Sequence, residues 1–276
     1  PKRLTGMTAC ELTSCRPAAR SPRALRELAL LTLLYVGYSA ARLVGDSDVG
    51  TATEHAETLL RIEQWLFLDG ERWANRALHT VPGLAVAASY WYAALHYLVT
   101  PAVLVWVYRA RPAHYRPVRN ALVIGSVVGL VGFTVLPMAP PRMLPGYVDT
   151  LATTSGYGWW GADASAPEGL GSLTNELAAM PSLHVGWAFW CAWVLVRLTR
   201  DRTVRRWAVL YAAGTALVVV VTANHYVLDA VAGVFVMAIG MNLAGRYRPG
   251  RRRPTADAHT CSRTVREPDS RDALAA

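Results

Sequence analysis

Two short polar segments, Pro181-Ser182-Leu183-His184 and Asn224-His225-Tyr226-Val227-Leu228-Asp229, each open a long apolar run. Asp229 follows His225 by four positions, so a helix through both residues would place them on one face. The carboxylate would then accept the imidazole Nδ1 proton and leave Nε2 as an oriented nucleophile or base. Ionisable side chains gathered at one level of a membrane usually mark a substrate site.

Both histidines are predicted at helix amino termini, because Pro181, Ser182 and Asn224 are typical helix-start residues. Such ends expose backbone N–H groups and a partial positive charge, which suit a phosphate. Arg142 follows the third apolar run on the same side, and its guanidinium can bind two phosphate oxygens. The catalytic candidates are His184, His225 and Asp229, and the substrate-binding candidates are Arg142, Ser182 and Asn224.

Each candidate also has a simpler structural explanation. An isolated interfacial histidine such as His184 is more often a hydrogen-bonded structural group, and Arg142 near a span end can serve as an interfacial anchor. His96 lies inside the second apolar run with Tyr92 four positions before it. We interpret it as a packed histidine that is hydrogen-bonded between helices. The coincidence of two histidines, an aspartate and an arginine on one side of the membrane favours a functional site.

The elements that position these residues are apolar segments. The chain has 276 residues, of which 53% are hydrophobic and 17% charged, a composition typical of an integral membrane protein. Six stretches approach the roughly 20 residues that a helical span requires. They are residues 28–44, 81–108, 118–138, 181–198, 207–223 and 225–244. The predicted fold is therefore an all-α integral membrane bundle of six transmembrane helices, over residues 26–245, with polar tails at 1–25 and 246–276.

Basic residues indicate the orientation. They concentrate in residues 1–26, 109–119, 197–206 and 246–253, whereas the intervening loops are acidic or neutral. Because Lys and Arg accumulate on the cytoplasmic side, both termini are predicted to be cytoplasmic and the site to face outward from the plasma membrane. The net charge of +9 is explained by topology and by contact with membrane lipids, so no nucleic acid partner is expected.

Composition also indicates the character of three further segments. Residues 53–78 are predicted to form an amphipathic helix on the outer surface, and the long outer loop 139–180 is expected to cover the site. Residues 28–44 also resemble a cleavable signal, an alternative that would leave five spans. The four cysteines, at positions 10, 15, 191 and 261, do not form a disulfide framework.

The order Pro140-Pro141-Arg142, Pro181-Ser182-Leu183-His184 and His225 to Asp229 resembles the type-2 phosphatidic acid phosphatase superfamily over residues 54–245. Within it, the chain looks closest to the branch of inositol phosphorylceramide synthases and their bacterial relatives. The resemblance implies an enzyme that transfers or hydrolyses the phosphoryl group of a lipid phosphate without metal or cofactor. His225 would form a phosphohistidine, Asp229 would orient it, His184 would protonate the leaving oxygen and Arg142 would bind phosphate.

The sequence departs from the superfamily pattern at five positions. Val135 replaces a lysine, Met143 replaces the proline after the arginine, Val218 and Val219 replace Ser-Arg, and Leu183 replaces the glycine of Pro-Ser-Gly-His. Leucine at this position matches the transferase-like branch. Two cations are missing, and an uncompensated charge is costly at low dielectric. The site is therefore better matched to a phosphodiester, or to transfer between lipids, than to a doubly charged monoester.

Three other classes of protein remain as alternatives. A membrane transporter or channel should carry polar residues or broken helices near the bilayer midplane, where only His96 fits. A metalloenzyme would use two histidines and an aspartate, but the seven histidines include no H-x-x-x-H box. A serine protease using Ser182 is disfavoured because this serine has no nucleophile-elbow context.

Overall fold

A computed structural model describes residues 24–43, 48–161 and 176–246, and in these ranges all regular elements are helical. The tails expected at 1–25 and 246–276 lie almost entirely outside these ranges. The elements, in order, are α1 (Ala24–Leu43), α2 (Val49–Trp65), α3 (Glu71–His79), α4 (Pro82–Ala110), α5 (Pro112–Val135), η1 (Pro141–Met143), α6 (Thr150–Thr153), η2 (Ser155–Tyr157), α7 (Leu183–Leu198), α8 (Arg202–Val221) and α9 (Val227–Arg246).

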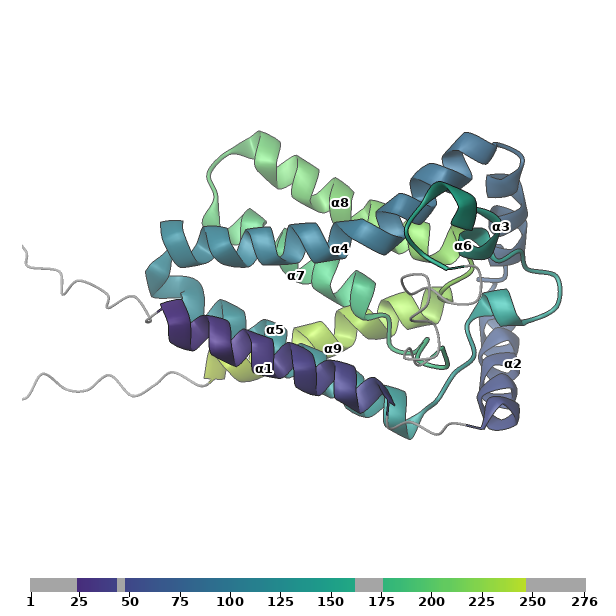
Figure 1. Ribbon diagram of the computed structural model, residues 1–276, viewed down its shortest axis with the longest axis horizontal. Coiled ribbons are helices and arrows are strands. Elements are labelled where there is room, and N and C mark those ends of the chain that lie inside the picture. Colours follow the sequence, from purple (N-terminus) through teal and green to yellow (C-terminus); the bar gives the residue numbers. More distant parts are fainter. Residues whose placement is uncertain (1–23, 44–47, 162–175, 247–276) are drawn as a thin grey trace, which may run out of the picture.

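Within the described ranges, four helices, α4, α5, α8 and α9, are long and apolar enough to cross a membrane. The prediction of an all-helical membrane protein is therefore confirmed, and four of the six expected spans meet these criteria. The helix α7 is apolar but has only 16 residues, a length of about 24 Å at 1.5 Å per residue. The helix α1 lies along α5 in Figure 1, and its role as a span stays a prediction.

The two ends of the bundle differ. The start of α1, the end of α9 and the α4–α5 and α7–α8 connections lie at one end, and α2, α3 and α6 lie at the other (Figure 1). An ion pair between Arg119 and Glu27, at 3.4 Å, joins α5 to α1 at the first end. At the second end, α2 runs across the direction of the long helices (Figure 1).

The prediction of one amphipathic helix over residues 53–78 was wrong, because two helices occupy this region. The first, α2, ends at Trp65, and α3 begins at Glu71. Between them Phe67 has a φ of 58°, a left-handed conformation that helical residues do not adopt. Residues buried on one side of each helix, such as Leu59 and Leu78, still give both helices the amphipathic character that the sequence indicated.

Small residues let the two helices that carry the histidines approach closely. A Cβ atom on Gly233 of α9 would lie 2.1 Å from the carbonyl oxygen of Ser182, and one on Gly186 of α7 would lie 2.8 Å from the carbonyl oxygen of Gly233. On the other side of α7, Leu183 packs where a Cβ on Gly129 would be only 2.5 Å away. Such small-residue contacts are typical of helix packing in membranes. They bring the starts of α7 and α9 together.

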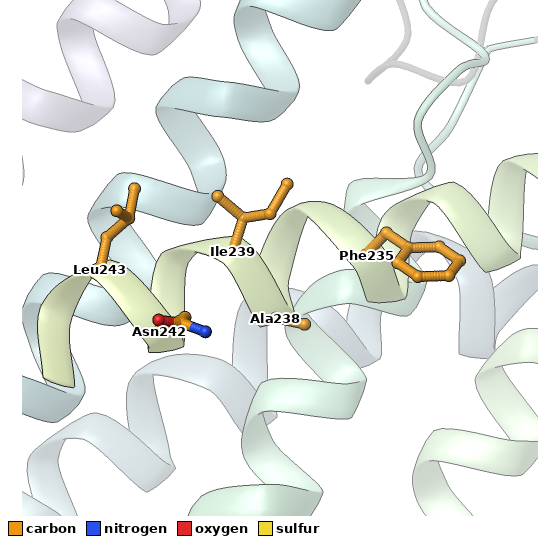
Figure 2. Close-up of a pocket in the computed structure, with 5 residues that line it drawn as sticks. All are labelled: Phe235, Ala238, Ile239, Asn242 and Leu243. Atoms are coloured by element: carbon orange, nitrogen blue, oxygen red, sulfur yellow. The ribbon is translucent and has the colours of Figure 1, made fainter. Parts of the chain in front are cut away.

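A shallow groove lies on the surface of α9, well along the helix from its start. Figure 2 shows its five lining residues projecting from the helix: Phe235, Ala238, Ile239, Asn242 and Leu243. Phe235 is 65% exposed, so this face is turned away from the bundle. In a membrane it is a lipid-facing surface and takes no part in the site described below.

We predict that Gly233→Ala lowers the thermal stability of the protein. The added methyl group meets the backbone of α7, which cannot move aside, and overpacking of this kind costs about 1–3 kcal/mol. Gly245→Ala on the same helix is the control, because nothing lies within 4 Å of its added Cβ. Melting temperatures of purified protein in detergent test the prediction. Equal melting temperatures for the two variants would contradict the close approach of α7 and α9.

Candidate active site

The starts of α7 and α9 meet at the end of the bundle that α2, α3 and α6 cover. The backbone N–H of Ser182 donates to the carbonyl oxygen of Asp229 at 3.0 Å. The rings of His184 and His225 lie with their centroids 5.7 Å apart. The structure thus brings together the two histidines, which 41 positions separate in the sequence, and leaves them close enough to contact one small group between them.

His225 lies in the turn before α9. The helix begins at Val227, so the expectation that His225 and Asp229 share a helical face was wrong. Ala223 makes the turn with a φ of 58°, and the N–H groups of Asn224 and His225 both donate to the carbonyl oxygen of Val219, at 3.1 and 3.0 Å. This turn, rather than a helix, sets the direction of the imidazole.

The hydrogen bond that orients His225 is accepted by a different residue than the one that the sequence suggested. Its Nδ1 lies 2.8 Å from the carbonyl oxygen of Ala179, which can only accept, so Nδ1 carries the proton. The distance from Nδ1 to Asp229 Oδ2 is 3.6 Å, which is too long for a hydrogen bond. Within the part of the chain that the structure describes, the buried Nε2 has no hydrogen-bond partner. Its lone pair is therefore available.

Asp229 is fully buried and serves the turn as well as the histidine. Its Oδ2 accepts the N–H of Tyr226 at 3.0 Å. At 3.6 Å from Nδ1 the carboxylate can still stabilise a positive charge on the His225 ring through space, because Coulomb attraction at this distance is strong in a buried site. The carboxylate thus fixes the turn and counters the charge of the ring.

The carboxyl end of the long outer loop holds Ala179 in place. Met138 and Ala178 form an isolated bridge, in which Met138 N donates to Leu177 O at 2.8 Å and Ala179 N donates to Met138 O at 3.3 Å. Residues 162–175 of this loop lie outside the described residues. The sequence indicated that this loop lies over the site, and its described end does contact the site, but no motif indicated that the contact is the backbone carbonyl of Ala179.

His184 sits in an aromatic environment that α4 supplies. Tyr92 stacks on it with centroids 4.4 Å apart, and His96 meets it edge to face at 4.3 Å. The Nδ1 atom of His96 lies 3.0 Å from the carbonyl oxygen of Tyr92. The sequence interpretation of His96 as a packed histidine omitted this contact with His184. The only hint in the sequence was the four-residue spacing of Tyr92 and His96, which places both side chains on one face of α4. Ser182 caps α7 as expected, with its Oγ 3.5 Å from Val185 N.

Arg142 is held against the turn that carries Asn224. Its backbone N–H donates to Ala223 O, and its guanidinium donates to Asn224 Oδ1, both at 2.8 Å. The guanidinium also donates to the carboxylate of Glu176 and lies 3.5 Å from that of Asp149. Arg142 and Asn224, both predicted to bind substrate, are thus hydrogen-bonded to each other, and two carboxylates already pair with the arginine.

We expected free N–H groups at the start of α9 for phosphate, but the first two of them are hydrogen-bonded within the protein. Val227 N donates to Glu71 and Leu228 N donates to Glu63 Oε1, the latter at 2.8 Å. Burial and the neighbouring charge of Glu63 raise the pKa of Glu71 to about 9. Burial also raises the pKa of Glu63. Both glutamates escaped sequence analysis because they belong to a segment that was read as a surface helix.

The positions that depart from the superfamily pattern add no charge to the site. Val135 is 75% exposed at the end of α5, and Val219 is fully buried, where it contributes its carbonyl oxygen to the turn. The residues described here include no group of three His, Cys, Asp or Glu side chains arranged to hold a metal ion.

Fold and site together define a helical integral membrane protein with a two-histidine site at one end of its bundle. The sequence model of the PAP2 superfamily matches residues 57–243, which is more than half of the chain, so the protein belongs to the PAP2 superfamily. No curated protein and no solved structure matches the chain. Membership suggests lipid phosphatase or phosphotransferase activity and supports an enzyme of the phosphatase type.

Proposed function

We propose that the protein transfers or hydrolyses the phosphoryl group of a lipid phosphate through a phosphohistidine on His225. The observation that carries the proposal is the fixed tautomer of this ring: Nδ1 donates to Ala179 O, and the lone pair of Nε2 has no partner in the described part of the chain. A nucleophile with this geometry needs no separate base. His184, whose ring centroid lies 5.7 Å away, is the proposed acid.

The reaction has two steps. In the first, His225 Nε2 forms a bond to phosphorus while the bond from phosphorus to the ester oxygen breaks, and His184 donates a proton to that leaving oxygen. In the second, water or an alcohol attacks phosphorus, His184 takes the proton of the attacking hydroxyl, and the P–N bond breaks. The positive charge on the phosphorylated ring is stabilised by Ala179 O and by the Asp229 carboxylate.

The charges around the site favour a substrate with one negative charge. Arg142 already contacts the carboxylates of Glu176 and Asp149, and Asp229 is buried beside His225. A phosphate monoester near neutral pH carries close to two negative charges, whereas a diester carries one. We therefore propose that the substrate is a phosphodiester, or that the reaction is a transfer between lipids like that of inositol phosphorylceramide synthases.

We further propose that the site faces outward from the plasma membrane. The site lies at the end of the bundle with α2, α3 and α6. The α4–α5 and α7–α8 connections lie at the opposite end (Figure 1), and arginines are frequent in these connections and in the adjoining helix ends, at residues 109–119 and 197–206. The positive-inside rule places those connections in the cytoplasm.

We predict that His225→Ala and His184→Ala each lower turnover by about a thousandfold or more, because nucleophile and acid act as one unit. Asp229→Asn should cost about 10²- to 10⁴-fold, since an amide does not stabilise the charged ring. Turnover of a panel of lipid phosphomonoesters and diesters, with and without lipid alcohols and with excess chelator, is followed by mass spectrometry.

The control is His114→Ala, an exposed histidine at the opposite end of the bundle. Near-normal turnover by His225→Ala would remove the proposed nucleophile. Loss of wild-type activity in chelator, with recovery on adding a divalent ion, would show that a metal mechanism operates instead.

We predict that cysteines at Gly156 and Ala113 react from opposite sides of the membrane. Both positions are exposed, and nothing lies within 4 Å of a Cβ on Gly156. After replacement of the four native cysteines, a membrane-impermeant thiol reagent should label Gly156→Cys in intact cells, and Ala113→Cys only after lysis. The reverse pattern would place the site on the cytoplasmic face.

A further inference from the structure

Two buried carboxyl groups from different helices meet at the first turn of α9. Glu63 belongs to the last turn of α2 and is 0% exposed, and Glu71 is the first residue of α3 and is 3% exposed. Glu71 accepts the N–H of Val227, and Glu63 Oε1 accepts the N–H of Leu228 at 2.8 Å. The two surface helices thus bind consecutive N–H groups of the helix that follows the proposed nucleophile.

The groups that face this pair provide little positive charge. The Asp229 carboxylate approaches from α9, together with the phenol of Tyr226. The Tyr147 hydroxyl donates to Glu71 Oε2 at 3.4 Å, and Arg72 lies over the Tyr147 ring, 5.1 Å from its centroid. Within the described ranges, neither Glu63 nor Glu71 forms a salt bridge.

In a low-dielectric interior without a nearby cation, ionising two adjacent carboxyl groups at once costs much free energy. Burial, and then the charge of Glu63, raise the pKa of Glu71 to about 9. Glu63 Oε2 has no hydrogen bond of standard geometry to any residue that the structure describes, and the Glu71 carboxyl is its neighbour. A proton between the two groups satisfies this oxygen. The pair then carries one negative charge, which is favourable at a helix amino terminus.

We propose that Glu63 and Glu71 share one proton and act as positioning residues, which fasten α2 and α3 to the start of α9 and so hold His225 in place for phosphoryl transfer. The positioning role rests on the function proposed above. Loss of the shared proton puts two negative charges beside Asp229 at the start of α9. The resulting repulsion loosens the contact of α2 and α3 with α9, and His225 loses its fixed direction.

The effect of pH on stability follows from the direction of the pKa shift. A carboxyl group whose folded pKa lies above its unfolded value binds its proton more tightly in the folded state. The stabilisation that it provides is complete below the unfolded pKa, near 4.5, and is lost as the pH rises to the folded pKa, about 9 for Glu71. Burial raises the pKa of the neighbouring Tyr147 phenol, which therefore stays protonated over this interval.

The first arm of the test measures unfolding of the purified full chain in detergent between pH 6 and 10. In the wild type, the pair should raise the unfolding equilibrium constant by up to about tenfold per pH unit until pH 9. Glu71→Gln and Glu63→Gln should flatten this dependence, because an amide imitates the protonated acid and does not titrate. The exposed Glu57 on α2 gives the matched control, Glu57→Gln, which should follow the wild type.

The second arm measures lipid phosphate turnover over the same pH interval, with each variant normalised to its own maximum. Deprotonation of the acid His184 lowers kcat in every variant as the pH rises. In the wild type, ionisation of the Glu63–Glu71 pair should add a further loss near pH 9, and Glu71→Gln should lack this further loss. Glu71→Ala should lower kcat about tenfold or more with little change in KM, because Val227 N loses its acceptor, and Glu71→Gln should recover most of this loss.

The two arms separate the failure of this inference from that of the proposed function. Coincident unfolding profiles for wild type and Glu71→Gln would overturn the shared proton, whatever the activity. Different unfolding profiles with coincident activity profiles would overturn the positioning role. A wild type with the expected unfolding profile and no turnover of any lipid phosphate would overturn the proposed function, and the positioning role with it.

Discussion

The hydrogen bond from His225 Nδ1 to the carbonyl oxygen of Ala179 is the interaction on which the site depends. A carbonyl oxygen accepts and never donates, so this bond selects one tautomer and leaves the lone pair on Nε2. The bond exists because Met138 fixes the segment before α7, and because the turn at Ala223 directs the imidazole toward that segment. Close packing of Gly186 against Gly233 then sets the separation of the two histidine rings.

The electrostatics of the site are unusual for a proposed phosphate-binding site. Arg142 is buried between acidic and amide partners, and the first N–H groups of α9 are bound by glutamates rather than left for an anion. Negative charge near the site disfavours a doubly charged substrate, because each uncompensated charge is costly where water is excluded. A second set of carboxyl groups, Glu63 and Glu71, connects α2 and α3 to α9 and adds to the negative character of this end of the bundle.

Much of this arrangement could be predicted from the sequence, because it depends on local patterns. Apolar run lengths predicted the helical membrane bundle, and the residues at the two polar segments identified His184 and His225 as neighbours. The turn before α9, the carbonyl of Ala179 and the capping role of Glu71 were not predictable. Backbone carbonyls leave no sequence signature, and a glutamate on an amphipathic helix is usually solvated. Leu183 stands where the superfamily pattern has glycine. The structure shows that its side chain packs against Gly129, a contact that the sequence did not indicate.

The most direct test of the central claim is to find the covalent intermediate. Purified protein is mixed with a lipid phosphodiester for less than one turnover, denatured at alkaline pH because phosphohistidine is labile in acid, digested and examined by mass spectrometry. The account predicts an adduct on His225, with the mass of the transferred phosphoryl group, that appears no later than the released alcohol. Release of the alcohol without an adduct on His225, or with an adduct on His184 instead, would contradict it.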